Sequence, residues 1–196
     1  MREGAYLNGV TIPVDDGGLS TPEGHPTSNL PLRAGKGWLY EGGIRVPAIV
    51  RWPGVTTPGS VRDAPIASAD YYPTIMEYAG LSPLPKQHVD GRSLLPLIRG
   101  ETTTPRALFW HYPHYGNQGG SPGSAIREGD WKLIAFHGPS RSDDRYELYN
   151  LLEDPGEGDS CADTNPEMLN KLKANLNEWY TEVGAKFPLP FTNNGS

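Results

Sequence analysis

Residues 165–183 read NPEMLNKLKANLNEWYTEV and carry the clearest folding signal in the chain. Asn165 suits the N-cap of a helix, Pro166 its first position and Glu167 its first turn. Apolar side chains then recur at the spacing of three and four residues that places them on one helical face; they are Leu169, Leu172, Leu176, Trp179 and Val183. The pattern predicts an amphipathic helix in which each buried apolar side chain contributes about 1.5–3 kcal/mol.

Immediately upstream of this helix, the hydrophobic pattern changes to that of short strands. The predicted strands are residues 107–112, 124–128, 131–137 and 146–151. Gly129-Asp130 separates the second strand from the third at the spacing of a tight hairpin. We therefore expect a small antiparallel sheet packed against the terminal helix.

The first quarter of the chain is rich in loop-forming residues. Residues 10–14 (VTIPV) predict a strand, although Pro13 cannot donate a ladder hydrogen bond. Residues 19–43 predict a long loop, which in a compact domain is usually functional or disordered. Residues 44–52 (IRVPAIVRW) predict a second strand, which ends at Pro53-Gly54.

Two helices are predicted between these strands and the C-terminal sheet. Residues 70–79 place apolar side chains on one helical stripe, with Asp70 as a possible cap and Gly80 as the end. Residues 90–100 (DGRSLLPLIRG) predict a short helix or turn interrupted by proline.

The composition excludes several classes of protein. The 196 residues include 17 basic and 23 acidic side chains, so the formal charge of −6 argues against a nucleic-acid-binding surface. No apolar run approaches the ~20 residues of a membrane-spanning helix. Cys161 is the only cysteine, which excludes an internal disulfide and a thiolate zinc cluster. Residues 1–8 lack the pattern of a secretory signal, so we expect no signal peptide in this chain.

Asp15 and Asp16 are the first candidate site residues. They follow a predicted strand and precede Gly17-Gly18, and two carboxylates at the end of a strand offer hard oxygen ligands to calcium or magnesium. A solvated turn explains the same residues, because turns favour aspartate and glycine.

Lys36 is the second candidate. It lies between Gly35 and Gly37, where its ammonium and the neighbouring amides can approach an oxyanion. The segment is not a phosphate-binding P-loop, because that motif requires Gly where this chain has Leu30, and Ser or Thr where it has Gly37. An ordinary exposed loop lysine is the alternative.

His111 and His114 form the third candidate, within the aromatic run FWHYPHY. The predicted strand ends at Pro113, which separates the directions of the two imidazoles and disfavours a shared metal. Aromatic neighbours suit contact with a sugar or aryl substrate, although a core role explains them equally well.

Taken in order, these segments resemble the C-terminal part of the formylglycine-dependent sulfatases, the arylsulfatase-like branch of the alkaline phosphatase superfamily. The matching segments are DDGG (15–18), LRAGKGWLYEGGIRVP (32–47), RWPG (51–54), ADYYPT (69–74), DGRSLL (90–95), REGDWKL (127–133) and ELYNLLEDP (147–155). The GKG…YEGG spacing is a highly specific signature of these enzymes.

The resemblance implies an α/β, alkaline phosphatase-like fold. Residues 1–105 would be the end of the catalytic domain, with a remnant of its large central sheet, and residues 106–196 a C-terminal subdomain with the small antiparallel sheet and terminal helix. Lys36 would be the catalytic lysine that contacts the sulfate ester oxygens. Asp15 and Asp16 would ligate one calcium ion, with Asp16 standing where the family has asparagine.

The resemblance also implies a formylglycine nucleophile, made from a Cys/Ser-x-Pro-x-Arg motif that this chain does not contain. We therefore expect the chain to be a C-terminal fragment of a sulfuric ester hydrolase, with the N-terminal half as its structural partner and no turnover on its own. Substrates would be sulfated small molecules or glycans. Family members are usually exported, periplasmic or lysosomal, but the sequence assigns no compartment here.

Two other functions fit the same residues. The chain could be a non-catalytic module that binds sulfated glycans or a partner protein through the Lys36 loop and the HYPHY run, and the missing nucleophile favours this alternative. A phosphoester hydrolase of the same superfamily is disfavoured by the GKG…YEGG segment.

Overall fold

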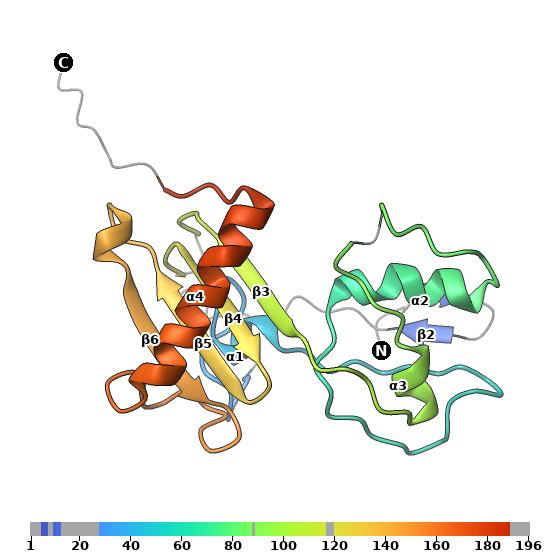
Figure 1. Cartoon of the computed structure of the whole chain (residues 1–196). Coiled ribbons are helices and arrows are strands. Elements are labelled where there is room, and N and C mark those ends of the chain that lie inside the picture. The colour runs from blue at the N-terminus through green and yellow to red at the C-terminus, as the bar shows by residue number, and fades with distance from the viewer. Residues whose placement is uncertain (1–4, 8–9, 13–27, 88, 117–119, 189–196) are drawn as a thin grey trace. The chain divides into compact units, whose positions relative to one another are not determined.

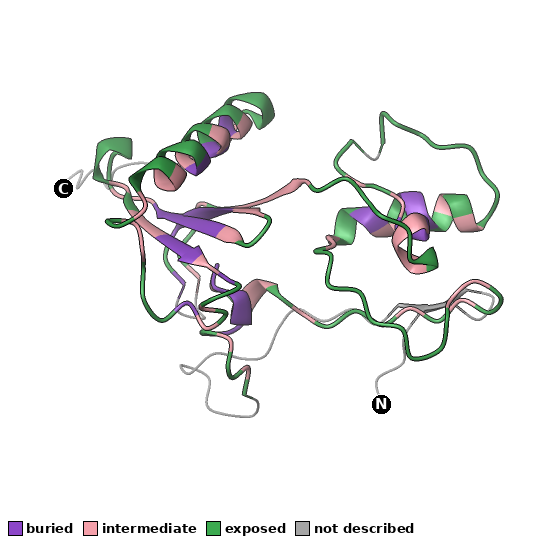
Figure 2. Cartoon of the chain, turned by 60° about the horizontal axis from the view of Figure 1, so that its bottom comes forward, coloured by how far each residue is buried: buried purple, intermediate pink, exposed green. Residues whose placement is uncertain are grey.

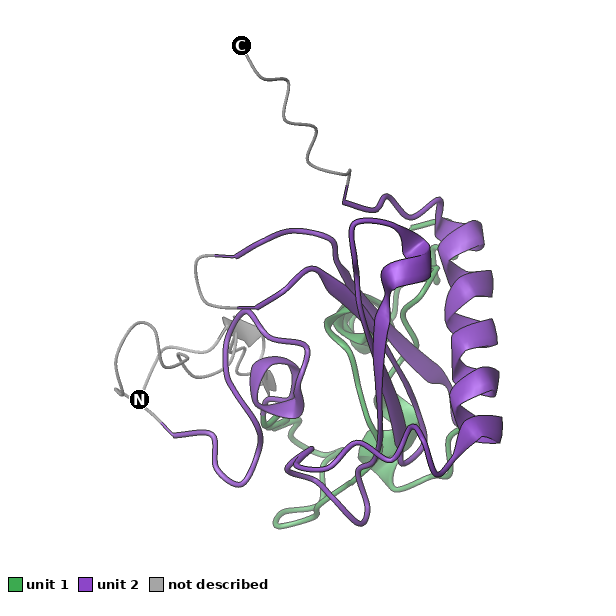
Figure 3. Cartoon of the chain, turned by 90° about the vertical axis from the view of Figure 1, so that its left-hand side faces the viewer, with its two compact units in different colours: residues 1–14, 47–104 green, residues 15–46, 105–196 purple. Residues whose placement is uncertain are grey.

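A computed structural model describes residues 5–7, 10–12, 28–87, 89–116 and 120–188 (Figure 1). The chain divides into two compact units: residues 1–14 with 47–104, and residues 15–46 with 105–196 (Figure 3). The second unit is thus built from two separated stretches of sequence. The division into catalytic and C-terminal domains at residue 105 stays a prediction about the complete family fold.

The sheet of the second unit is a meander of four antiparallel strands. Its strands are β3 (Ala107–Tyr112), β4 (Gly123–Glu128), β5 (Trp131–Phe136) and β6 (Arg145–Asn150), in the spatial order β3-β4-β5-β6. Gly129 takes a φ of +61° in the turn between β4 and β5. A 3₁₀ helix, η3 (Arg141–Asp143), precedes β6. All four predicted strands are confirmed, each to within one residue at its ends.

Helix α4 (Pro166–Val183) covers one face of this sheet and confirms the predicted terminal helix (Figure 1). Leu172, Leu176 and Tyr180 are its buried side chains, and they pack on Ile126, Leu133, Ala135 and Leu148. The predicted apolar stripe was wrong at its end: Val183 is 50% exposed. Leu172, Leu176 and Tyr180 are each four residues apart and share one face of the helix, so Tyr180, and not Val183, is the last side chain of the helix that packs on the sheet.

Asn165 stands at the N-cap position of α4 as predicted, but its side chain does not cap the helix. Its amide group donates instead to the carbonyl of Cys161 and the hydroxyl of Thr164, at 3.1 and 3.0 Å. The helix ends at Gly184, whose φ of +61° is the left-handed conformation common at C-terminal caps.

The opposite face of the sheet is covered by residues 38–44, which include the helical turn α1 (Glu41–Ile44). Leu39 and Tyr40 pack on inward-facing side chains of the strands; these are Ala125, Ile134, Phe136 and Tyr149. Figure 3 shows α1 on one side of the sheet and α4 on the other, and Figure 2 shows the buried strands between them. The unit therefore has three layers, with two hydrophobic clusters.

The predicted strand at residues 44–52 was wrong. Ile44 belongs to α1, where its amide and that of Gly43 donate to the carbonyl of Tyr40. Residues 45–50 have no regular secondary structure, and Arg51 takes part only in an isolated bridge. A strand is stable only when neighbouring strands accept its hydrogen bonds, and no ladder forms with this stretch in the described residues.

The first unit contains a two-stranded antiparallel sheet and three short helical segments. Strand β2 (Val10–Ile12) confirms the predicted strand over its first three residues, and it pairs with β1 (Ala5–Leu7), which was not predicted. The helical segments are η2 (Ser68–Asp70), α2 (Tyr71–Tyr78) and α3 (Leu95–Arg99). Both α2 and α3 were predicted, and a left-handed glycine follows each closely.

Asp70 precedes α2 as expected, but its carboxylate does not cap that helix. The carboxylate is fully buried and accepts hydrogen bonds from the backbone amides of Ala67 and Arg92, both at 2.8 Å. Asp70 thus ties the start of α2 to the segment before α3. Within the described residues, no helix is long and apolar enough to cross a membrane.

Candidate functional site

The loop that carries Lys36 folds tightly back on itself. The amide of Gly42 donates to the carbonyl of Arg33 at 2.9 Å, and that of Trp38 to Gly35 at 3.1 Å. A Cβ atom on Gly42 would lie 2.3 Å from the carbonyl oxygen of Arg33, and one on Gly43 would lie 2.2 Å from that of Trp38. These approaches leave no room for a side chain, which gives the spacing GKG…YEGG a steric reason.

Lys36 itself is half-buried, between the buried Gly35 and the exposed Gly37. Gly37 has a φ of +91°, and its carbonyl oxygen would lie 1.9 Å from a Cβ atom on Gly120. The segment after β3 therefore passes directly against the Lys36 loop, and glycines on both sides allow this contact.

A buried network of charges attaches the C-terminal end of the loop to the sheet. Glu41 is 1% exposed, and its two carboxylate oxygens contact Nζ of Lys132 at 3.0 Å and the guanidinium of Arg127 at 3.2 Å. Lys132 also lies 2.8 Å from Oε1 of Glu157, a close ion pair without good hydrogen-bond geometry. Lys132 and Glu157 are both fully buried.

The sequence analysis did not identify Glu41, Arg127, Lys132 or Glu157 as site residues. One signal was available: Lys132 alternates with Ile134 and Phe136 along β5, so the period of two places a lysine on an otherwise apolar, buried face. A buried ammonium requires a carboxylate partner. The identity of that partner, 91 residues away in the sequence, has no local signal.

Aromatic hydroxyls and Arg33 complete the contact between the loop and the sheet. Tyr40 and Tyr149 both donate to Oε2 of Glu147 at 2.7 Å, and the guanidinium of Arg33 stacks on the Tyr40 ring at 3.9 Å. Burial, together with Glu147, raises the pKa of Tyr40 far above its ordinary value. Burial alone would raise the pKa of Glu147, but the hydrogen bonds from Tyr149, Tyr40 and Arg145 outweigh it and lower the pKa.

His111 lies on the α4 face of the sheet, the face opposite to the Lys36 loop. Its ring contacts those of Tyr180 and Phe187, with centroids 5.7 and 5.3 Å away. Nε2 donates to the backbone carbonyl of Lys186 at 2.7 Å, and Nδ1 is 2.7 Å from the hydroxyl of Ser124. The Nε2 bond therefore holds the segment after α4 on the sheet, while Nδ1 has its partner within the sheet, on β4. Substrate contact by His111 stays a prediction.

His114 is exposed and packs edge-on against Tyr112, with ring centroids 5.6 Å apart. It lies beyond the end of β3, whereas His111 lies within the strand and packs on Tyr180 and Phe187. Asp15 and Asp16 lie outside the described residues. In the part of the chain that is described, no three metal-ligating side chains form a cluster.

The hydrogen-bond chain continues beyond Ser124, whose hydroxyl is 2.9 Å from Nε2 of His137. Nδ1 of His137 lies 3.4 Å from the carboxylate of Asp144, which also pairs with Arg141 at 3.3 Å. Burial lowers the pKa of His137 more than Asp144 raises it, and Arg141 and His111 lower it further. The folded chain therefore favours the neutral imidazole.

This shift predicts a loss of stability in mild acid. Below the ordinary histidine pKa of 6.5 the unfolded chain binds a proton that the folded chain takes up less readily, so stability is full above this value and falls as the pH drops through it. As the pH falls below 6.5, we expect wild type to lose more stability than His137→Gln, measured by urea unfolding. His114→Gln, at an exposed site, should follow wild type; equal slopes for all three proteins would contradict the prediction.

Comparison with known proteins identifies the family. A family model described as "N-sulphoglucosamine sulphohydrolase, C-terminal" matches residues 34–183. A sulfatase of Formosa agariphila is 39% identical over 180 residues, covering 82% of this chain and 31% of that protein. Human arylsulfatase A is 36% identical over 163 residues, covering 72% of this chain and 32% of its own length. The chain thus spans about a third of the length of these two curated relatives.

Solved structures agree with this result. The structure of Ps i-CgsB in complex with k-i-k-neocarrahexaose has a TM-score of 0.62 and 28% identity, covering 78% of this chain and 32% of that one. BT4656 in complex with D-glucosamine-2-N,6-O-disulfate has a TM-score of 0.59 and 27% identity, covering 69% and 28%. The fold is that of the alkaline phosphatase-like sulfatases, and the chain belongs to the sulfatase family.

Proposed function

We propose that this chain supplies the sulfate-contacting lysine and two calcium ligands to a sulfuric ester hydrolase. The observation that carries the proposal is the Lys36 loop, which holds a lysine between two glycines and is attached to the sheet at Glu41 by buried charges, in a chain of the sulfatase family. A fixed ammonium stabilises negative charge that develops on a sulfate ester oxygen without having to reorganise during the reaction.

The family resemblance implies calcium, and the donor chemistry of Asp15 and Asp16 fits this ion, because both supply hard carboxylate oxygens. These two residues would hold the ion, and the second negative charge, where the family has asparagine, would strengthen metal binding while repelling an anionic ester. The ion would act as a Lewis acid toward a sulfate oxygen. Calcium takes about 6–8 oxygens, so further ligands are needed besides these two residues.

Catalysis also needs the formylglycine nucleophile, whose Cys/Ser-x-Pro-x-Arg motif does not occur in these 196 residues. Nucleophile, metal and lysine act as a unit, and loss of one member removes most of the activity of the others. We therefore propose that the isolated chain is inactive and that an N-terminal sulfatase portion completes the site. Without that portion, the alternative of a non-catalytic module that binds sulfated glycans applies.

Sulfated saccharides are the proposed substrates. Two of the structural relatives were solved in complexes with saccharides, a neocarrahexaose and a disulfated glucosamine. His114 is the more accessible of the two predicted substrate-binding histidines, because it is exposed, whereas both ring nitrogens of His111 have partners within the unit. An exposed imidazole next to Tyr112 can contact a sugar by hydrogen bonding and ring stacking.

Aryl sulfate hydrolysis tests the proposal. The assay compares the 196-residue chain with the same chain extended by any Cys/Ser-x-Pro-x-Arg-containing polypeptide encoded upstream of Met1. The extended protein should turn over the ester, and Lys36→Ala should lower its kcat by about 10²–10³-fold, as the loss of one preorganised donor does elsewhere. The isolated chain should show none.

Lys86→Ala, which removes an exposed lysine of the other unit, is the control and should leave turnover unchanged. Hydrolysis by the isolated chain above that of its own Lys36→Ala variant would overturn the proposal. Binding of a sulfated saccharide without turnover by the extended protein, and without dependence on calcium, would select the binding module instead.

A further inference from the structure

We infer that Glu157 is the positioning residue of the Lys36 loop, holding both flanks of the loop at once. Its backbone carbonyl accepts a hydrogen bond from the guanidinium of Arg33 at 2.6 Å. Its carboxylate accepts one from the backbone amide of Glu41 at 2.5 Å. Arg33 lies three residues before Lys36 and Glu41 five residues after it, so a single buried residue joins the two ends of the loop.

The backbone of Glu157 supports this role. Its φ of +52° lies in the left-handed region, which residues with a Cβ atom adopt rarely and keep where the surroundings enforce it. The sequence here is Gly156-Glu157-Gly158, so the residue in the unfavourable conformation is the one between two glycines. A glycine would adopt this conformation without strain. The side chain of Glu157 must therefore contribute something that outweighs the strain.

That contribution is visible in the charge balance under the loop. Glu41 and Glu157 are two buried carboxylates, and Lys132 lies between them, with Arg127 on the far side of Glu41. Arg45, whose side chain is 55% exposed, also lies 3.9 Å from Glu41, so among the buried groups the single ammonium of Lys132 is shared by two carboxylates. Without the charge of Glu157, the ammonium of Lys132 has Glu41 as its one remaining carboxylate partner among these residues. Glu41 must then pair with both Lys132 and Arg127. The carboxylate of Glu157 thus holds the position of Glu41 in two ways, through its amide and through the shared lysine.

The turn that carries Glu157 is itself packed against the start of the loop. The amide of Glu157 donates to the carbonyl of Asp154 at 3.2 Å, closing the turn. A Cβ atom on Gly156 would lie 3.0 Å from the carbonyl oxygen of Pro31. Residues 154–158 therefore form a hydrogen-bonded turn that packs directly against the residues preceding the Lys36 loop. Glu157 does not itself contact a substrate, and its effect on the reaction would pass through the position of Lys36, so the inference rests on the proposed function.

Hydrogen exchange in the 196-residue chain tests the inference directly. In Glu157→Gln, the amides of residues 34–44 should exchange about tenfold faster or more, because the ion pair with Lys132 is lost and the bond to the amide of Glu41 is weakened, whereas the bond from Arg33 to the backbone carbonyl remains. Amides of α4 and of the β4–β5 pair should exchange as in wild type. Glu128→Gln is the matched control, since it removes a carboxylate whose pair with Lys171 is partly exposed, and residues 34–44 should be unchanged in it.

Glu157→Gly is the second variant, because it relieves the backbone strain while it removes the carboxylate. It should keep the sheet and α4 protected and still speed exchange at residues 38–44. A second readout is the rate at which the Lys36 amine is acylated, with the exposed Lys86 as internal reference. Both Glu157 variants should raise the ratio of the Lys36 rate to the Lys86 rate several-fold, whereas Glu128→Gln should leave the ratio unchanged.

The outcomes separate this inference from the proposed function. Unchanged exchange of residues 34–44 in both variants would overturn the positioning role of Glu157, whether or not the extended protein hydrolyses a sulfate ester. Equal loss of protection in α4, the sheet and the loop also overturns it, because Glu157 would then support the whole unit. Faster exchange confined to the loop supports the positioning role of Glu157 even if the extended protein has no sulfatase activity. A lack of sulfatase activity in the extended protein counts against the proposed function alone.

Discussion

Replacing Lys132 with methionine should lower the free energy of unfolding by about 3–5 kcal/mol, because it leaves the carboxylates of Glu41 and Glu157 buried without their shared partner. Methionine has a similar length and no charge, so the variant removes the ammonium with little change in packing volume. Arg127 still pairs with Glu41, whereas Glu157 keeps only backbone contacts. Urea unfolding followed by tryptophan fluorescence measures the difference.

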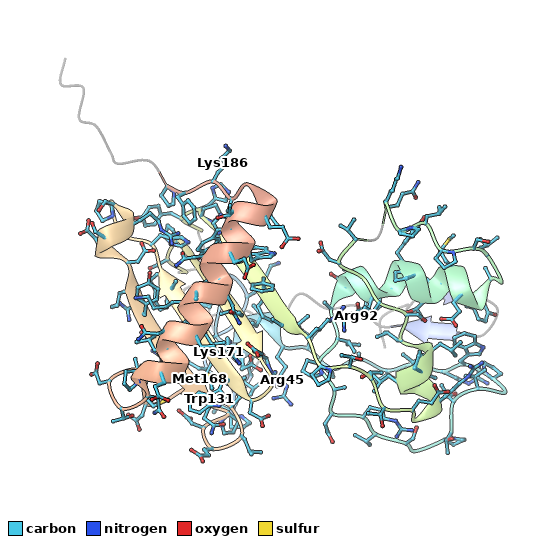
Figure 4. The ribbon with its side chains drawn as sticks, viewed as in Figure 1. Arg45, Arg92, Trp131, Met168, Lys171 and Lys186 are labelled. Atoms are coloured by element: carbon cyan, nitrogen blue, oxygen red, sulfur yellow. The ribbon has the colours of Figure 1, made fainter. Side chains whose placement is uncertain are left out.

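Lys171→Met is the matched control for this substitution. Lys171 lies on α4 (Figure 4) and pairs with Glu128 at 2.7 Å, but its side chain is 52% exposed. A surface pair of this kind contributes about 0–1 kcal/mol. If the two methionine variants lost the same stability, the buried network would have no special energetic role.

Replacing Gly43 with alanine should cost about 3 kcal/mol or more, at the upper end of what overpacking a well-packed site costs. The added Cβ atom would lie 2.2 Å from the carbonyl oxygen of Trp38 and 2.4 Å from that of Gly35. Both obstacles are backbone atoms of the same loop, so neither can turn aside as a side chain would. The loop must open, and the burial of Leu39 and Tyr40 on the sheet is then lost.

Gly54→Ala is the control for a glycine effect without a clash. Gly54 has a φ of +79° and nothing within 4 Å of its Cβ position, so its substitution costs only backbone strain, about 1 kcal/mol. The same unfolding experiment, combined with hydrogen exchange of residues 34–44, compares the two variants. A Gly43→Ala protein as stable as Gly54→Ala, with a protected loop, would show that the steric explanation of the GG pair is incorrect.

The elements that were predictable from the sequence are those with a local pattern. Helix α4 carries a spacing of 3.6 residues, and strands β3 to β6 are short apolar runs, two of which are separated by the Gly129-Asp130 turn. The strand expected at residues 44–52 has the same kind of apolar run. The prediction of a strand there was wrong because a strand also needs neighbouring strands to bond with. The sequence of one segment does not show whether those strands are present.

The residues of the candidate site likewise fall into those that a local sequence pattern could identify and those that it could not. Lys36 and its glycines form a contiguous motif, so the sequence alone was enough to select them. Glu41, Lys132 and Glu157 come from three distant segments and meet only when the loop docks on the sheet, so no local pattern indicated them. Part of the placement of His111 could have been predicted, because Trp110 and His111 are neighbours on one strand and must point to opposite faces of the sheet. Trp110 packs on the face covered by the Lys36 loop, and His111 packs on the face covered by α4.

Residues 15–46 and 105–196 form one compact unit, although 58 residues separate them in the chain. Recombination between related sulfatases that crossed over at residue 105 would therefore join a loop from one parent to a sheet from the other. Glu41 of the first parent would then have to find Lys132 and Glu157 in the second. Functional hybrids should be those whose crossovers inherit the two stretches from the same parent, which makes this pairing a guide for designing chimeric enzymes.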